Sequence, residues 1–153
     1  MEGSRMSQHY IETMQYTFYT GGDQVVVSPN IRYIIIDKSV NVIPDETFRD
    51  HEQLERIKLN DELQMIGDSA FYGCHHLQII NFPLSVSSCL ETIDRWAFYK
   101  CTSLKQMKLP PWLKRINRGA FACCTSLIVI NLPPLLEVIG CGAFSGCTSL
   151  IAA

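Results

Sequence analysis

The chain carries a regularly repeated pattern of apolar and polar positions. The clearest part of the pattern is a phenylalanine that occupies the same position in each repeat, which we call a column: Phe48, Phe71, Phe98, Phe121 and Phe144. The interval between them is constant, except for one longer step between the second and the third. Ala or Thr precedes each Phe, Cys or His follows three positions later, and Leu follows six positions later. Self-similarity at a fixed period predicts a solenoid, in which each repeat forms one coil and buries its apolar face only against its neighbours.

Each repeat also predicts one short β-strand. Within the segment L-x-x-I-x-L, apolar and polar residues alternate, as in residues 57–59, and this period of two is typical of a half-buried strand. Strands that recur once per coil must run parallel, because the remainder of the repeat returns the chain to its starting side. Pro83, Pro110 and Pro133 follow the last apolar residue, where the missing N–H donor ends the strand.

The return path of each repeat is predicted to open with a turn. The position after the closing Ile is occupied in successive repeats by Gly67, Asp94, Asn117 and Gly140. These residue types tolerate a left-handed backbone at low cost, so we expect that conformation there. Asp45 and Asp68 stand shortly before the Phe of their repeats, where they would cap a short helical turn.

The repeats divide the chain into an N-terminal segment and one solenoid domain. Residues 1–24 do not fit the pattern, and we interpret them as a cap over the first Phe layer. The solenoid domain spans residues 25–153. Its units lie near 25–47, 48–70, 71–97, 98–120 and 121–143, with a partial unit at 144–153. The extra residues of the longer unit fall within Leu84 to Cys89, which predicts a surface loop.

The repeat consensus, L-x-x-I-x-L followed by I-G-x-x-A-F-x-x-C-x-x-L, resembles the BspA-like leucine-rich repeat family over residues 25–153. The resemblance implies an α/β repeat solenoid. This would be a right-handed leucine-rich-repeat coil with a parallel sheet on its concave side and short helices or turns on its convex side. It implies no enzyme activity, and members of the family are described as protein-binding or adhesive.

Composition and charge narrow the classes of function. The 153 residues are 47% apolar and 18% charged, which fits one globular domain with a core. A net charge of −2 provides no broad field for nucleic acid or an acidic membrane. No run approaches the ~18 apolar residues of a membrane span, and residues 1–14 lack the apolar region of a secretory signal. We therefore expect a cytoplasmic protein with no nucleic-acid partner and no membrane segment.

The seven cysteines fit the repeat better than they fit a reactive centre. Their odd number and the absence of a signal segment predict free thiols. One thiol per coil forms a line with spacing of about 5 Å, not a tetrahedral metal cluster. Cys74 precedes His75 and His76, but adjacency alone supplies neither the contact nor the orienting group of a Cys-His nucleophile. The sequence predicts no catalytic residue, no metal and no cofactor.

The candidate binding surface is the outward side of the predicted strands. We name the following ten residues the outer strip: Tyr33, Ile35, Arg56, Lys58, Ile79, Asn81, Gln106, Lys108, Val129 and Asn131. They include three cations and no carboxylate, on a chain that is net acidic. A solvated sheet face is the plain interpretation. The functional hypothesis is a shallow surface for an extended or acidic protein segment, because positions outside the consensus are free to vary for recognition.

The predicted function is thus non-catalytic binding of a protein or peptide through the concave strand face. The alternative is a fragment of a longer structural or adhesive surface repeat array. The sequence ends at residues 151–153, where a further strand is expected, and no polar closing unit follows. A solenoid end normally carries a cap, so we also expect that the last coil could associate end to end with another chain.

Overall fold

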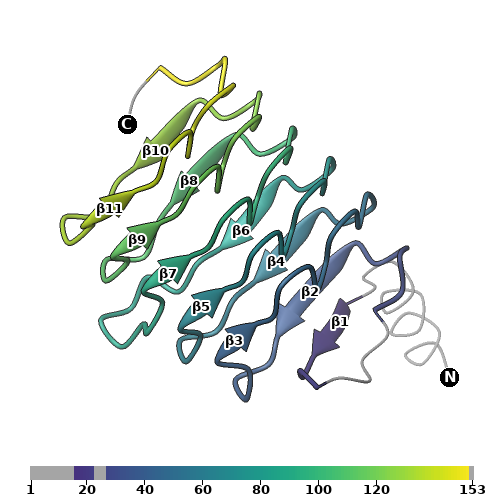
Figure 1. The fold of residues 1–153 in the computed structure, drawn as a ribbon. Coiled ribbons are helices and arrows are strands. Elements are labelled where there is room, and N and C mark those ends of the chain that lie inside the picture. The colour runs from purple at the N-terminus through teal and green to yellow at the C-terminus, as the bar shows by residue number, and fades with distance from the viewer. Residues whose placement is uncertain (1–15, 23–26, 152–153) are drawn as a thin grey trace, which may run out of the picture.

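A computed structural model describes residues 16–22 and 27–151, and it shows a parallel β-solenoid (Figure 1). Its strands form two rows along the solenoid. The first row contains β1 (Tyr16–Tyr19), β2 (Tyr33–Ile36), β4 (Arg56–Lys58), β6 (Ile79–Asn81), β8 (Gln106–Lys108) and β10 (Val129–Asn131). The second row contains β3 (Val42–Ile43), β5 (Met65–Ile66), β7 (Thr92–Ile93), β9 (Arg115–Ile116) and β11 (Val138–Ile139). We call these rows the first and second sheet.

Each coil contributes two strands, so the prediction of one strand per repeat was incomplete. The second strand is very short and ends at the closing Ile, as in β5, where Met65 is half-buried and Ile66 is buried. A pair of residues is too few to show a period of two in the sequence. They pair because the neighbouring coils place the same short segment directly beside them.

The register between coils follows the sequence repeat. Tyr33 of β2 pairs with Arg56 of β4, and Arg56 pairs with Ile79 of β6, each one repeat further along the chain. Across the longer unit, Met65 of β5 pairs with Thr92 of β7, so the insertion leaves the register intact. All pairings are parallel, as predicted, and the second sheet is continuous from β3 to β11.

The five phenylalanines form one continuous stack inside the solenoid. Their ring centroids lie 5.0, 5.2, 5.3 and 5.6 Å apart from Phe48 to Phe144, with interplanar angles of 14°, 2°, 2° and 3°. The spacing is close to the separation of neighbouring strands. Tyr19 of β1 meets Phe48 edge-on, with centroids 5.1 Å apart. This ring therefore lies over the first layer, while residues 1–15 and 23–24 of the predicted cap fall outside the described residues.

The return path consists of turns, and the described residues contain no helix. The family resemblance implied short helices or turns on this side, and the structure shows turns, so the described chain is β rather than α/β. Main-chain groups in this path bond to the next coil. The N–H groups of Glu46, Phe48 and Asp50 donate to the carbonyls of residues 68, 70 and 72, at 2.9, 2.8 and 2.7 Å. A helical turn would direct these donors along its own axis, not across coils.

Left-handed residues occur in this path, but not at the predicted column. Positive φ values occur two positions later, as at Ser69 (56°) and Trp96 (50°), and again at Lys100 (59°) and Cys123 (60°). The predicted positions are not among them. The left-handed residues recur four positions apart, as at Trp96 and Lys100, and both of these donate their N–H to the next coil at 3.0 Å. The conformation therefore accompanies the bonds between coils, and it occurs at residues other than Gly.

The glycine at the predicted column serves close approach instead. A Cβ atom at Gly67 would lie 2.6 Å from Asp45 Oδ1 and 2.7 Å from the Ile43 carbonyl oxygen. Such contacts are too short for real atoms, so Gly67 allows the preceding coil to pack directly against its backbone.

The insertion in the longer unit lies at the surface, as predicted. Leu84 and Val86 are exposed, and Val86 is 86% accessible. The loop is attached to both neighbouring coils, because Ser85 Oγ donates to Asp61 Oδ1 at 2.8 Å and Trp112 Nε1 donates to the Val86 carbonyl at 2.9 Å.

The phenylalanine stack predicts a sharp difference between two aromatic substitutions. Phe98→Ala removes a fully buried ring between two others and should lower the free energy of unfolding by about 3–5 kcal/mol. Phe18→Ala removes a ring that is 61% exposed and should change it by less than about 0.5 kcal/mol. Urea denaturation measures both. Equal losses in the two variants would show that the ring stack is not the core.

Candidate functional site

The structure places all ten residues of the outer strip on the outer face of the first sheet. In β4, β6 and β8 the two flanking residues are exposed and the central one is buried. In β2, Tyr33 and Ile35 are half-buried while their neighbours Ile34 and Ile36 are buried. Side chains of successive coils lie side by side in rows, because Tyr33, Arg56 and Ile79 share one register position.

Sequence reasoning missed two aromatic residues that extend this surface. Tyr16 and Phe18 of β1 pair with Tyr33 and Ile35 of β2, so they lie on the same outer face, and they are 53% and 61% exposed. The Tyr16 and Tyr33 ring centroids lie 6.0 Å apart. The signal was present in the β-prone segment 16–19, whose alternation places Tyr19 inside and Phe18 outside. Because residues 1–24 were interpreted as a cap, the alternation within residues 16–19 was not used to place these two side chains.

The cations of the strip are accessible for an incoming anion. Arg56, Lys58 and Lys108 are exposed, and the structure shows no ion pair for any of them within its described residues. The Arg56 guanidinium lies 5.8 Å from the centre of the Tyr33 ring, within the range of a cation–π contact. A neighbouring carboxylate, Glu55, is already engaged with Arg32 at 3.7 Å and with the Tyr33 hydroxyl at 3.4 Å.

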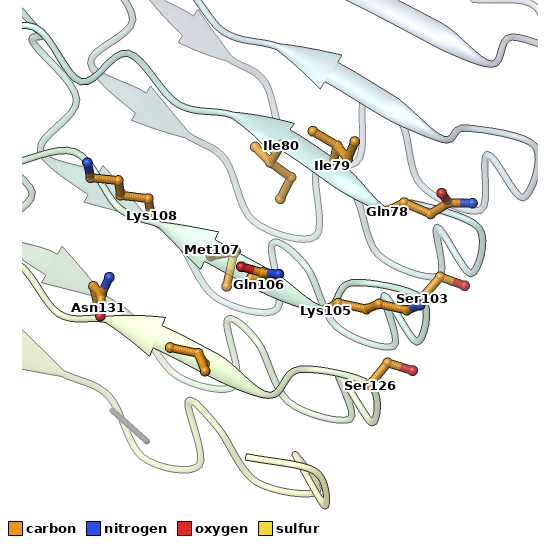
Figure 2. A pocket seen from close by; sticks show the side chains of 11 residues that line it. Gln78, Ile79, Ile80, Ser103, Lys105, Gln106, Met107, Lys108, Ser126 and Asn131 are labelled. Atoms are coloured by element: carbon orange, nitrogen blue, oxygen red, sulfur yellow. The ribbon is translucent and has the colours of Figure 1, made fainter. Parts of the chain in front are cut away.

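The outer face is hollowed between β6, β8 and β10, where a depression of about 850 Å³ lies (Figure 2). Five residues of the outer strip line it: Ile79, Gln106, Lys108, Val129 and Asn131. Buried Ile80 and Met107 contribute to its floor. Lys105 stands at one end of β8 and Lys108 at the other, as Figure 2 shows. The strip prediction missed Lys105, which precedes the strand and does not follow its alternation.

The depression lies where the first sheet is interrupted. β4 pairs with β6 and β8 pairs with β10, but β6 and β8 belong to separate hydrogen-bonded sheets. The second sheet crosses the same pair of coils without a break. The two coils therefore stay together along one side and separate along the other.

Phe82 gives a physical reason for this separation. It occupies the column that holds Leu59, Leu109 and Leu132 in the other repeats, and it is only 7% exposed. Its ring centroid lies 6.5 Å from that of Phe98 in the next coil, with the planes at 67°. A ring larger than leucine, wedged edge-on between two coils at the end of β6, holds β6 away from β8.

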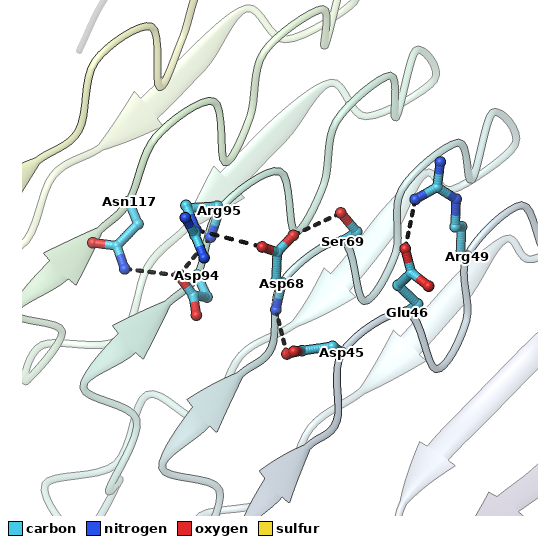
Figure 3. A network of polar contacts seen from close by, with 8 residues as sticks. All are labelled: Asp45, Glu46, Arg49, Asp68, Ser69, Asp94, Arg95 and Asn117. Carbon is cyan, nitrogen blue, oxygen red and sulfur yellow. Dashed lines mark hydrogen bonds and ion pairs between the residues drawn. The ribbon is translucent and has the colours of Figure 1, made fainter.

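A second polar surface lies on the turn side of the coils (Figure 3). Asp45 Oδ1 accepts a hydrogen bond of 2.9 Å from the Asp68 N–H, and Asp94 Oδ1 accepts one of 2.9 Å from Asn117 Nδ2. Asp68 Oδ2 also lies 3.4 Å from Arg95 Nε. The predicted helix-capping role of Asp45 and Asp68 was therefore wrong. These side chains join successive coils, and Asp68 also accepts a hydrogen bond of 2.7 Å from Ser69 Oγ in its own coil.

The cysteine column forms a ladder of thiol–carbonyl contacts inside the solenoid. Each thiol donates to the carbonyl of the Phe one coil earlier, at sulfur–oxygen distances of 3.2, 3.3, 3.2 and 3.1 Å for Cys74, Cys101, Cys124 and Cys147. All seven cysteines are free thiols. His51, in the same column, is held by its Nδ1 atom against the Arg49 carbonyl at 3.2 Å. The column therefore supports the interpretation of small, buried packing groups.

Burial keeps the inner thiols protonated. It raises the pKa of Cys74 from 9.0 to about 12, and it raises the pKa of Cys101 well above 9.0. The Cys147 thiol, together with burial, raises the pKa of Cys124. A thiolate is the nucleophilic form, so these three thiols are poor nucleophiles at neutral pH.

Known proteins share the repeat of this chain. A family model described as the BspA type leucine rich repeat region matches residues 22–151 in six copies. Among curated proteins, none matches the sequence. No helix in the described part of the chain is long and apolar enough to cross a membrane.

Three crystal structures illustrate the structural likeness. A leucine rich repeat protein from T. pallidum is 31% identical with a TM-score of 0.72, and the match covers 77% of this chain and 56% of that one. A leucine-rich repeat protein from Bacteroides ovatus is 35% identical with a TM-score of 0.70, covering 78% and 30%. A leucine rich cell surface protein from Faecalibacterium prausnitzii is 29% identical with a TM-score of 0.68, covering 80% and 31%. The chain thus spans 56% of the first protein and 30% and 31% of the other two.

The buried thiols predict a loss of stability at alkaline pH. The folded state holds the Cys74 proton to a higher pH than the unfolded chain, so the stabilisation is complete below about pH 9 and is lost as pH rises toward about 12. Between pH 8.5 and 10 the free energy of unfolding should fall by about 1 kcal/mol less in Cys74→Ala than in the wild type. Cys141→Ala, which removes an exposed thiol, serves as the control for loss of a cysteine as such. Identical pH profiles for Cys74→Ala and wild type would contradict the burial argument.

Proposed function

Because this chain belongs to the BspA-type leucine-rich repeat family, we propose that it is a non-catalytic module that binds an extended, acidic segment of a partner protein along the outer face of its first sheet. One observation carries the proposal. The face combines three exposed cations with exposed apolar side chains and presents no carboxylate among its ten strip residues, on a chain of net charge −2. A solvated face of average composition would carry both signs of charge.

The arrangement of side chains supports an extended partner. Tyr16, Phe18 and Tyr33 give the face an aromatic end, Arg56 and Lys58 lie in its middle, and the depression lies at the far side. A segment lying across the strands would meet aromatic contacts first, then Arg56 and Lys58, and last a hollow with an apolar floor that Lys108 also lines. Exposed ion pairs are individually worth about 0.2–1 kcal/mol, so the aromatic and apolar contacts must supply much of the affinity.

A second candidate function is a part in a longer surface array. It is favoured by the likeness to the Faecalibacterium prausnitzii protein, which is described as a cell surface protein. The last described coil also exposes Leu135, Ile139 and Ile151, at 45%, 50% and 81%. Stacking of further repeats or of a second copy on this coil would bury them, which corresponds to the end-to-end association expected from the sequence.

Charge reversal on the outer strip tests the binding proposal. The triple variant Arg56→Glu, Lys58→Glu and Lys108→Glu should bind the acidic, apolar peptide acetyl-ELELELEL-amide at least about tenfold more weakly, because each reversal replaces attraction by repulsion. Isothermal titration calorimetry measures the dissociation constant. The melting temperature should change by no more than about 2 °C, since all three side chains are exposed.

A matched variant controls for net charge. Lys38→Glu, Lys100→Glu and Arg118→Glu change the same charge at exposed positions away from the outer strip. This control should bind the peptide within about twofold of wild type, apart from a weak long-range effect that salt screens. Equal weakening in both triple variants, or no weakening in the first, would contradict the proposed face.

A further inference from the structure

One backbone hydrogen bond joins each pair of successive coils in the first sheet from β2 onward, except the pair that contains β6 and β8. The residue before each strand donates its N–H to the equivalent carbonyl one coil earlier, as in the bonds Glu55 to Arg32, Gln78 to Glu55, Ile128 to Lys105 and Ile151 to Ile128, at 2.8, 2.9, 2.8 and 3.0 Å. The equivalent bond from Lys105 N to the Gln78 carbonyl is absent, although both residues are described. The interruption therefore leaves backbone donors on β8 and acceptors on β6.

Residues of β6 and β8, which do not pair with each other, line the depression. Gln78 and Ile79 line it on the β6 side, and Lys105, Gln106 and Lys108 line it on the β8 side. Gln78 and Lys105 are exposed, so the Lys105 N–H and the Gln78 carbonyl are open to a ligand that can bond to both of them. A peptide main chain offers both a donor and acceptors, whereas an inorganic anion such as sulfate offers acceptors alone.

The charge of the depression favours a negatively charged group. Lys105 and Lys108 line it, and none of the described residues around it is acidic. Its floor is apolar, because Ile80 and Met107 are core residues that reach it from below and Val129 stands beside them. A complementary ligand therefore joins a carboxylate, a main-chain N–H and an apolar side chain in one residue.

We propose that this depression binds the C-terminal residue of the partner segment, with its free α-carboxylate against Lys105. The carboxylate accepts hydrogen bonds from the Lys105 N–H and ammonium group, the apolar side chain lies over Met107, and the terminal N–H donates toward the Gln78 carbonyl. This inference rests on the proposed function of the outer face, and it adds the end at which the bound segment terminates.

Two forms of one peptide test it. Acetyl-ELELELEL with a free C-terminal carboxylate should bind about tenfold more tightly than the same peptide with a C-terminal amide, because charge-assisted hydrogen bonds are lost in the amide. Acetyl-EELELELEL-amide carries the same net charge as the free acid and should bind like the amide. Equal affinities for the free acid and this control would overturn the α-carboxylate anchor while leaving the proposed function intact.

A variant outside the outer strip locates the anchor. Lys105→Gln should reduce the preference for the free acid to less than about threefold and change the affinity for the amide by less than about twofold. Lys100→Gln, an exposed lysine on the turn side, should preserve the full preference. A preference that survives Lys105→Gln would place the carboxylate elsewhere and refute the proposal. Failure of every peptide to bind would refute both this inference and the proposed function.

Backbone NMR signals distinguish direct contact of the α-carboxylate with Lys105 from non-specific attraction between the charges of the peptide and the protein. In ¹H–¹⁵N correlation spectra, the free acid should shift the backbone amide signals of Lys105 and Gln106 strongly, and the amide peptide should not. Unchanged Lys105 and Gln106 signals at saturating free acid would contradict direct contact with these donors.

Discussion

The backbone hydrogen bond from one coil to the next is the constraint on which the structure depends. In the return path, the Phe48, Phe71, Phe98 and Phe121 amides each donate to the Ala carbonyl of the following coil at 2.8 Å. This repeated bond holds successive coils at one separation and in one register. The stacked rings, the thiol ladder and the paired strands all adopt the same spacing, because each is attached to the same backbone ladder.

A fixed frame leaves the outer positions as the place where function can vary. Buried columns accept few alternatives, whereas Arg56, Ile79 and Gln106 occupy one outer row without sharing chemistry. The single interruption of the first sheet follows from the same constraint. Phe82 in a leucine column and the adjacent insertion separate β6 from β8, while the second sheet keeps the coils together. A local departure from the repeat thus creates the depression.

The parts of the structure that could be predicted are those encoded in side chains. The Phe layer, the register of the repeat and the outward positions of β4 and β8 follow from which residues are apolar. The second strand at Met65–Ile66, the left-handed Trp96 and the cross-coil role of Asp45 could not be predicted in this way. They depend on bonds between the backbones of different coils, which the residue types only weakly reveal. The missing Lys105–Gln78 bond belongs to the same class.

Amide hydrogen exchange most directly measures the backbone hydrogen bonds that join successive coils. The amides of Glu55, Gln78 and Ile128 occupy one column and are bonded to the preceding coil, whereas Lys105 occupies that column without the bond. Resolved by NMR, the first three should exchange slowly, with protection approaching the global free energy of unfolding, and Lys105 should exchange at least about tenfold faster. Uniform protection of all four amides would show an unbroken first sheet, and uniformly fast exchange would show that the coils are not joined as described.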